Sequence, residues 1–209
     1  MNQAPTPSAI SNVLAMSEPQ HMWHKLVWEL HHLIDSMSVW VDDGGYPEPA
    51  FRAFNTAVTA WHLSDWLWQS GPQARAALKK RFICISSNET PTGIRRGLGR
   101  FQHAVHEDCR ALKVCREIAN GSKHMRTDNL DPAIKAMASW DPVVDGAGLA
   151  KPGDLIMGLK IADGGKTQDA VLWFIEALGY WDRLMSEEKL LEGAKPMPNK
   201  LVKAKPQNR

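Results

Sequence analysis

Residues 54–68 read FNTAVTAWHLSDWLW, and their large apolar side chains recur at the spacing of an α-helix. On a helical wheel of about 100° per residue, they form one narrow stripe: Phe54, Val58, Trp61 and Trp68. Pro49 favours the first turn of this helix, and the sequence SGP at 70–72 favours its end. We therefore expect a helix between these two points, packed against other helices.

One carboxylate falls within this stripe. Asp65 lies at the centre of the apolar side chains on the wheel, and His62 lies at their edge, one turn away. An unpaired buried carboxylate is costly, so we expect Asp65 to be neutral, paired or bound to a cation. Two explanations satisfy this expectation: a structural hydrogen bond to a tryptophan N–H or a helix end, and a functional role as an acid, base or ligand.

The composition predicts one soluble domain. Of the 209 residues, 44% are apolar and 23% are charged, as in ordinary globular proteins. Nine tryptophans supply large side chains for a core. No apolar run reaches the roughly 18 residues of a membrane span, and the N-terminus has no secretory signal pattern. Three cysteines without CxxC spacing indicate free thiols, and we expect a cytoplasmic protein.

Helical periodicity also marks the N-terminal part of the chain. The sequence SEPQ at 17–20 predicts the start of a first main helix that ends near Trp40. The FNTAVTAWHLSDWLW helix is the second. The sequence QARAALKKRF at 73–82 predicts a shorter helix directly after it.

Two further main helices complete a mainly α, four-helix-bundle-like fold. The third covers roughly residues 106–120, because Gly97 and Gly99 weaken an earlier start. The fourth begins after Thr167, which we expect to act as its N-cap. Four amphipathic helices of this kind predict a bundle with one core.

A small β-hairpin or sheet is expected at 126–166, before the last helix, where turn sequences flank short apolar runs such as LIMGLKI. We therefore divide the chain into a disordered N-terminus at 1–16, a single helical domain at 17–192 and a basic disordered tail at 193–209. The tail holds five of the 25 basic residues and no acid, which leaves 20 basic against 23 acidic residues in the remainder. A body with a formal charge of −3 does not indicate a broad nucleic-acid surface.

The densest polar stretch is CREIANGSKH at 115–124. If the third helix continues through it, four polar side chains form a row on one side: Arg116, Asn120, Lys123 and His124. Two cations, an amide and an imidazole suit either neutralising Asp65 or binding an anion. The alternative is an ordinary helix end, with a C-cap at Asn120-Gly121 and the basic groups near the negative helix terminus.

The WHLSDW and CREIANGSKH stretches together resemble a group of uncharacterised bacterial proteins with WHxxDW and CRDIANGxKH motifs. The resemblance covers most of residues 17–190 and implies a helical bundle, but it implies no activity. A looser similarity is to the HEPN superfamily of helical-bundle ribonucleases and toxins. Its signature is an arginine and a histidine with four to six residues between them, often with a polar residue directly after the arginine.

In HEPN enzymes the arginine holds phosphate and the histidine transfers a proton at the 2′-hydroxyl or the leaving oxygen. The stretch NGSKH matches the polar residue and the histidine, as Asn120 and His124, whereas the arginine position is Ala119 and the nearest arginine is Arg116. Two literal matches to the spacing occur elsewhere, as many as chance gives for this composition: Arg96 with His103, and Arg100 with His106.

Three hypotheses follow. The first is a HEPN-like ribonuclease or toxin component acting on RNA, in which His124 transfers protons, Arg116 or Lys123 binds phosphate, and Asp65 or His62 orients His124. The second is a non-enzymatic binding or assembly module, in which the same residues form a buried polar network that fixes helix register. The third is a metal site formed by His62, Asp65 and His124, whose ligand types suit zinc, iron or manganese. We also expect a homodimer, and the sequence identifies no cofactor.

Overall fold

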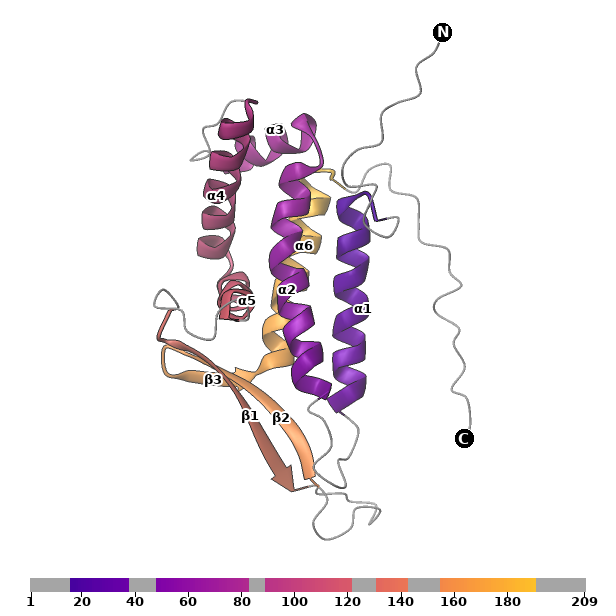
Figure 1. Ribbon diagram of the computed structural model, residues 1–209, viewed down its shortest axis with the longest axis vertical. Helices are drawn as coiled ribbons and strands as arrows, with labels where there is room; N and C mark the ends of the chain where they lie inside the picture. The colour runs from indigo at the N-terminus through magenta and orange to yellow at the C-terminus, as the bar shows by residue number, and fades with distance from the viewer. Residues whose placement is uncertain (1–15, 38–47, 83–88, 122–130, 143–154, 191–209) are drawn as a thin grey trace, which may run out of the picture.

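A computed structural model of the chain describes residues 16–37, 48–82, 89–121, 131–142 and 155–190 (Figure 1). These residues form six helices and a three-stranded sheet in the order α1 Pro19–Met37, α2 Glu48–Gln69, α3 Pro72–Arg81, α4 Pro91–Asp108, α5 Arg110–Gly121, β1 Ile134–Pro142, β2 Leu155–Asp163, β3 Lys166–Asp169 and α6 Ala170–Glu187. The expected fold class, a helical bundle with a small sheet before the last helix, is confirmed.

The bundle is built around α2. Helices α1, α2 and α6 run side by side along the long axis, α4 lies on the other side of α2 from α1, and α5 is seen end-on below α4 (Figure 1). Packing brings α2 into contact with every other helix and with β2. Four aromatic side chains are fully buried in the resulting core: Trp68, Phe101, Phe174 and Trp181. Among the described helices, none has the length and apolar character needed to cross a bilayer.

Small residues form the centre of the buried face of α2, and larger buried side chains such as Trp61 and Leu67 flank them. Ala57, Ala60 and Ser64 are completely buried, which lets neighbouring helices approach closely. On the side that faces α1, the Lys25 ammonium pairs with the buried carboxylate of Glu29 and donates a hydrogen bond to Thr59 Oγ1 at 2.6 Å. On the α6 side, the Trp181 indole donates to the carbonyl of Ala60 at 2.8 Å.

Helix α5 corresponds to the third main helix expected at 106–120, but α5 starts at Arg110, and residues 106–108 belong to a further helix, α4, that was not predicted. Helix α4 starts with Thr90 as N-cap, whose side chain accepts from the Gly93 N–H. It then runs through both glycines at 97 and 99 and ends where Cys109 adopts an extended conformation. The chain turns there and continues as α5, which packs against α2, α4 and α6.

The sheet is antiparallel with strand order β1-β2-β3 and covers the lower end of the bundle (Figure 1). Ion pairs join it to the start of α5. The Arg110 guanidinium donates to both carboxylate oxygens of Asp163, and Lys113 pairs with Asp131 at 2.7 Å. The expected N-cap at Thr167 is wrong: Thr167 lies in β3, and Asp169 caps α6 by accepting from the Val171 N–H.

Candidate functional site

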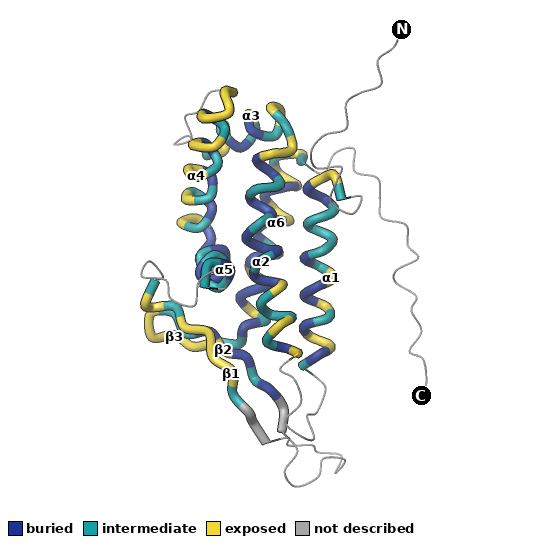
Figure 2. The backbone as a smooth tube through the Cα atoms, in the orientation of Figure 1, coloured by how far each residue is buried: buried dark blue, intermediate teal, exposed yellow. Residues whose placement is uncertain are grey.

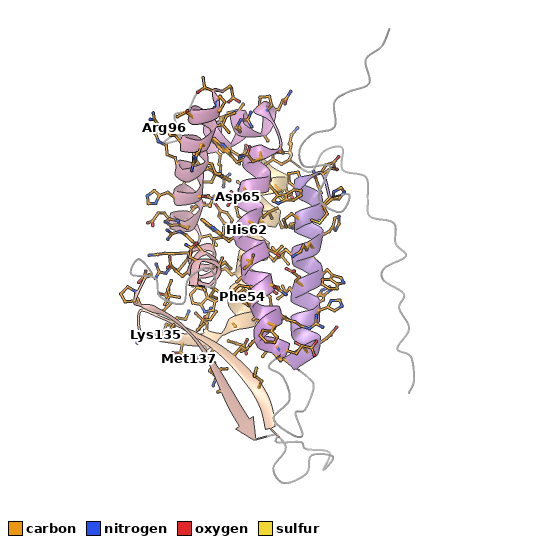
Figure 3. The ribbon with its side chains drawn as sticks, viewed as in Figure 1. Phe54, His62, Asp65, Arg96, Lys135 and Met137 are labelled. Carbon is orange, nitrogen blue, oxygen red and sulfur yellow. The ribbon has the colours of Figure 1, made fainter. Side chains whose placement is uncertain are left out.

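The two α2 residues singled out by the sequence, His62 and Asp65, are half-buried. Figure 3 shows them in the middle of α2. Both have interaction partners in the structure. The expectation that Asp65 occupies the centre of the buried face is wrong, because that centre is formed by the small residues Ala57, Ala60 and Ser64. Phe54 and Val58, which defined the predicted stripe, are themselves only half-buried.

The second motif begins on α5. Arg116 and Asn120 lie on this helix and are half-buried, whereas Lys123 and His124 lie outside the described residues. Helices α2 and α5 pack directly against each other, so the helices that carry the two motifs are neighbours, as expected. That the motif side chains meet each other stays a prediction.

Arg116 already has a partner on its own helix. Its guanidinium donates to Glu117 Oε1 at 2.7 Å, and the Glu117 side chain is only 5% exposed. The other carboxylate oxygen of Glu117 accepts the backbone N–H of Asp131 at 3.1 Å. Glu117 therefore ties the entry of the sheet to α5. Its burial was not predictable from the sequence, because a glutamate within a polar stretch carries no signal of burial.

A second group of polar residues lies on α4, in the part of that helix the sequence analysis did not predict. Four residues spaced by four, three and four positions form an exposed row along one side of α4: Arg96, Arg100, His103 and Glu107. Figure 2 shows this exposed face next to the largely buried α2, and Figure 3 labels Arg96 near its upper end. The row places two guanidinium groups and an imidazole in one line.

A shallow hollow lies beside this row. It has a volume of about 430 Å³ and is lined by Arg96, Gly99, Arg100 and His103. Gly99 is exposed, and a Cβ added there meets no other atom within 4 Å. The hollow is therefore open above the α4 backbone and flanked by positive charge, which suits an anionic group.

Two imidazoles meet at the lower end of the row. His103 Nδ1 lies 3.2 Å from His106 Nε2, and the same His106 nitrogen lies 3.2 Å from Glu107 Oε1. His103 is exposed, but the His106 side chain is only 10% exposed. Burial, followed by the positive charge of Arg116, lowers the pKa of His106, which favours the neutral imidazole.

His106 also connects α4 to the two motif helices. Its ring lies beside Trp61, with ring centroids 6.3 Å apart, and the charge of Arg116 on α5 acts on it. Trp61 is the first residue of WHLSDW. The α4 row and the two predicted motifs therefore border one another around His106.

A different cavity, of about 310 Å³, lies between the sheet and the helices. Apolar side chains such as Phe54, Ile118 and Phe174 dominate its lining, and Lys160 is the one charged residue among the described residues around it. It offers no histidine, cysteine or carboxylate for chemistry. The α4 row is the better candidate for a reactive or anion-binding site.

No protein-family model, curated protein or solved structure matches this chain. The function is therefore inferred from the site.

Proposed function

We propose that the protein is a HEPN-like ribonuclease that binds the phosphates of RNA on the exposed face of α4. The observation that carries this proposal is the hollow lined by Arg96, Arg100 and His103. An α-helix rises about 6 Å over four residues, close to the distance between successive phosphates of an extended strand. Arg96 and Arg100 are spaced to hold neighbouring phosphates, with His103 one turn further along.

One imidazole, that of His103, transfers the proton, and the second, that of His106, positions it. In the proposed reaction, His103 accepts the proton of a 2′-hydroxyl while that oxygen attacks the adjacent phosphorus. The bond to the 5′ oxygen breaks, this oxygen takes up a proton from water, and a 2′,3′-cyclic phosphate remains. His106 acts as a positioning residue, because its Nε2 lies 3.2 Å from His103 Nδ1 and holds the ring beside the hollow.

This proposal moves the HEPN arginine and histidine from the 116–124 stretch to α4. Both literal spacing matches, Arg96 with His103 and Arg100 with His106, lie on this one helix. Arg116, on α5, contributes to this site because its positive charge acts on His106. In the alternative location, His124 transfers the proton and Lys123 binds phosphate. The cleavage experiment below distinguishes the two locations.

The test is cleavage of fluorescently labelled, mixed-sequence single-stranded RNA in the presence of EDTA. We expect the wild-type protein to cleave this RNA but not the same sequence made of DNA, which has no 2′-hydroxyl. Replacing a general acid or base lowers the rate roughly 10²–10⁴-fold, so we expect at least a 100-fold loss in His103→Ala. His31→Ala is the matched control, because His31 is also exposed but lies on α1.

Three outcomes contradict the proposal. Absence of cleavage across single-stranded and hairpin RNAs overturns the nuclease function. Equal rates for His103→Ala and the wild type overturn the assignment of His103. Loss of activity in His124→Ala but not in His103→Ala moves the site from α4 to the WHLSDW and CREIANGSKH motifs.

The Arg116–Glu117 pair favours a second candidate function, a non-enzymatic assembly module. Here the polar residues of α5 hold the sheet on the bundle, since Glu117 accepts from Arg116 and from the Asp131 backbone. RNA binding without any cleavage, together with unfolding caused by Glu117→Ala, supports this function over the first. A homodimer is also part of the proposal, and sedimentation equilibrium tests it.

A further inference from the structure

Three metal-ligating side chains lie together at the end of α4. One ligand atom each from His103, His106 and Glu107 lies within 4.8 Å of the other two. This is the one such group of three or more histidine, cysteine and carboxylate side chains found in the described part of the chain. All three come from one helical surface, so the remaining coordination positions of an ion here open to water.

The two printed separations fit a coordinated ion. A tetrahedral Zn²⁺ with ligand bonds of about 2.0–2.1 Å holds its ligand atoms about 3.3 Å apart. His103 Nδ1 and His106 Nε2 are 3.2 Å apart, and His106 Nε2 and Glu107 Oε1 are 3.2 Å apart. The third pair, His103 and Glu107, involves two exposed side chains that can rotate to close the site.

The ligand types select the class of ion. Two imidazoles and one carboxylate suit zinc, cobalt, nickel and copper, whereas magnesium and calcium prefer oxygen ligands alone. A site with three protein ligands and open positions is typical of exchangeable or catalytic ions and not of closed structural ones.

We propose that His103, His106 and Glu107 bind one divalent transition-metal ion, such as Zn²⁺, and that this ion inhibits the nuclease. The bound ion occupies the lone pair of His106 Nε2 and the Nδ1 of His103, and it draws His103 away from the hollow where it accepts a proton. Binding of the ion stands independently of the activity; the inhibition rests on the proposed function.

The surroundings of His106 set the affinity. An imidazole that binds a metal through Nε2 carries its proton on Nδ1, and well-formed sites satisfy that N–H with a hydrogen bond. The Nδ1 atom of His106 is buried and has no hydrogen-bond partner among the described residues. Loss of such a partner weakens metal affinity roughly 10–100-fold. We therefore expect weakened, reversible binding, which suits regulation.

The binding test uses Co²⁺ as a spectroscopic probe and Zn²⁺ in calorimetry, both with the full chain after treatment with EDTA. We expect one ion per chain, visible d–d absorption of Co²⁺, and competition by Zn²⁺. His103→Ala and Glu107→Gln each lower the affinity at least tenfold. Both residues are exposed, so these variants keep the fold. His31→Ala, on α1, leaves binding unchanged.

The activity test compares Zn²⁺ inhibition of RNA cleavage in the wild type and in Glu107→Gln. Inhibition is expressed relative to the rate of each protein in EDTA, and we expect Glu107→Gln to need at least tenfold more Zn²⁺ than the wild type for half-inhibition.

The outcomes separate the two proposals. Co²⁺ binding that depends on His103 and Glu107, without RNA cleavage, confirms the metal site and overturns the nuclease. RNA cleavage without such binding overturns the metal site alone. Co²⁺ binding of equal strength in His103→Ala, Glu107→Gln and wild type places the ion elsewhere and also overturns the site.

Discussion

Helices α2 and α4 both carry histidine and charged side chains, but they differ in how much of their surface other helices and strands cover. Helix α2 packs against all five other helices and β2, whereas α4 packs against α2 and α5 and exposes one continuous face (Figure 2). On α2, the polar residues His62 and Asp65 are half-buried. On α4, Arg96, Arg100 and His103 project from the exposed side.

This difference separates a structural role from a binding role. A helix packed against many neighbours contributes mainly stability, and a polar residue on it is constrained by those neighbours. A helix with one uncovered face can present charged groups to a ligand without loss of core packing. We therefore expect substitutions on α2 to act first on folding, and substitutions on the α4 row to act on RNA.

The largest effect on stability is expected where α2 meets α4. Trp68 is fully buried, its ring stacks on Phe101 with centroids 5.6 Å apart, and its indole donates to the Ile94 carbonyl at 2.9 Å. Trp68→Ala creates a cavity and removes this hydrogen bond, so we expect it to lower the free energy of unfolding by about 3–5 kcal/mol, measured by urea denaturation.

Trp28→Ala is the matched control for this substitution. Trp28 lies on α1 and is 51% exposed, so we expect a loss below about 0.5 kcal/mol. Equal losses in the two variants contradict the description of α2 as the centre of the core.

The position of α2 was predictable from the sequence, because its large apolar side chains recur at helical spacing. The centre of its buried face was not predictable. The helix itself follows from Pro49, the apolar periodicity and the break at 70–72. A wheel based on large side chains chose Phe54 and Val58, which are half-buried, together with Trp61 and Trp68, which are buried. Alanine and serine occupy the centre of the buried face, because neighbouring helices approach closely there. Helix–helix distance is a tertiary property that one chain segment does not encode.

The candidate site was missed for a related reason. Gly97 and Gly99 lower helix propensity, so no helix was predicted over residues 91–105, where most of α4 lies. Tertiary packing overrides this preference, since Phe101 and Val105 are fully buried and Thr90 caps the helix. Once the helix runs through the glycines, Arg96, Arg100 and His103 fall into one row. The Thr90-Pro91 start signal was available in the sequence.

An intermediate effect is expected at Glu117, which joins α5 to the start of the sheet. Glu117→Ala leaves the backbone N–H of Asp131 without its partner and Arg116 without its carboxylate. We expect the free energy of unfolding to fall by about 1–3 kcal/mol. Glu176→Ala, at an exposed position of α6, is the control. A loss confined to the control contradicts the role of Glu117 in holding the sheet.

The arginines of the α4 row are expected to act on RNA affinity with little effect on stability. Arg96→Ala and Arg100→Ala each remove one phosphate contact, so we expect binding to weaken by about 1 kcal/mol, roughly fivefold. The slope of log affinity against log salt also falls by about 0.7 for each lost contact to a single strand. Filter binding at several salt concentrations measures both quantities.

Arg95→Ala is the control for these two arginines. Arg95 is exposed on the same helix but lies outside the row, so its removal keeps the overall charge change equal while sparing the hollow. If all three variants weaken binding equally, RNA responds to net charge alone and not to the row.

A smaller effect, of opposite sign, is expected at Gly99. Because a Cβ there meets open space, Gly99→Ala improves helix propensity and raises the free energy of unfolding by about 0.5–1 kcal/mol. Gly99→Leu extends into the hollow and is expected to reduce RNA cleavage. Gly179→Ala, in the middle of α6, gives a similar stabilisation without any effect on cleavage. Unchanged cleavage in Gly99→Leu contradicts the use of the hollow.

The smallest effect concerns how the N-terminal end of α4 is attached. Glu89, just before α4, accepts from Arg75 at 2.6 Å and from Lys79 at 2.9 Å, and these hydrogen bonds lower its pKa to about 2. Since the folded-state pKa lies below its ordinary value of 4.5, the stabilisation is present above that pH and is lost as the pH falls toward 2. We expect Glu89→Gln to remove this part of the acid dependence of the melting temperature.

The same pair attaches α4 to α2. Because Arg75 also donates to the Trp68 carbonyl, loss of the Arg75–Glu89 pair loosens the N-terminal end of α4 from α2. If the melting temperature of Glu89→Gln falls with pH between pH 7 and pH 2 as much as that of the wild type, the result contradicts this attachment.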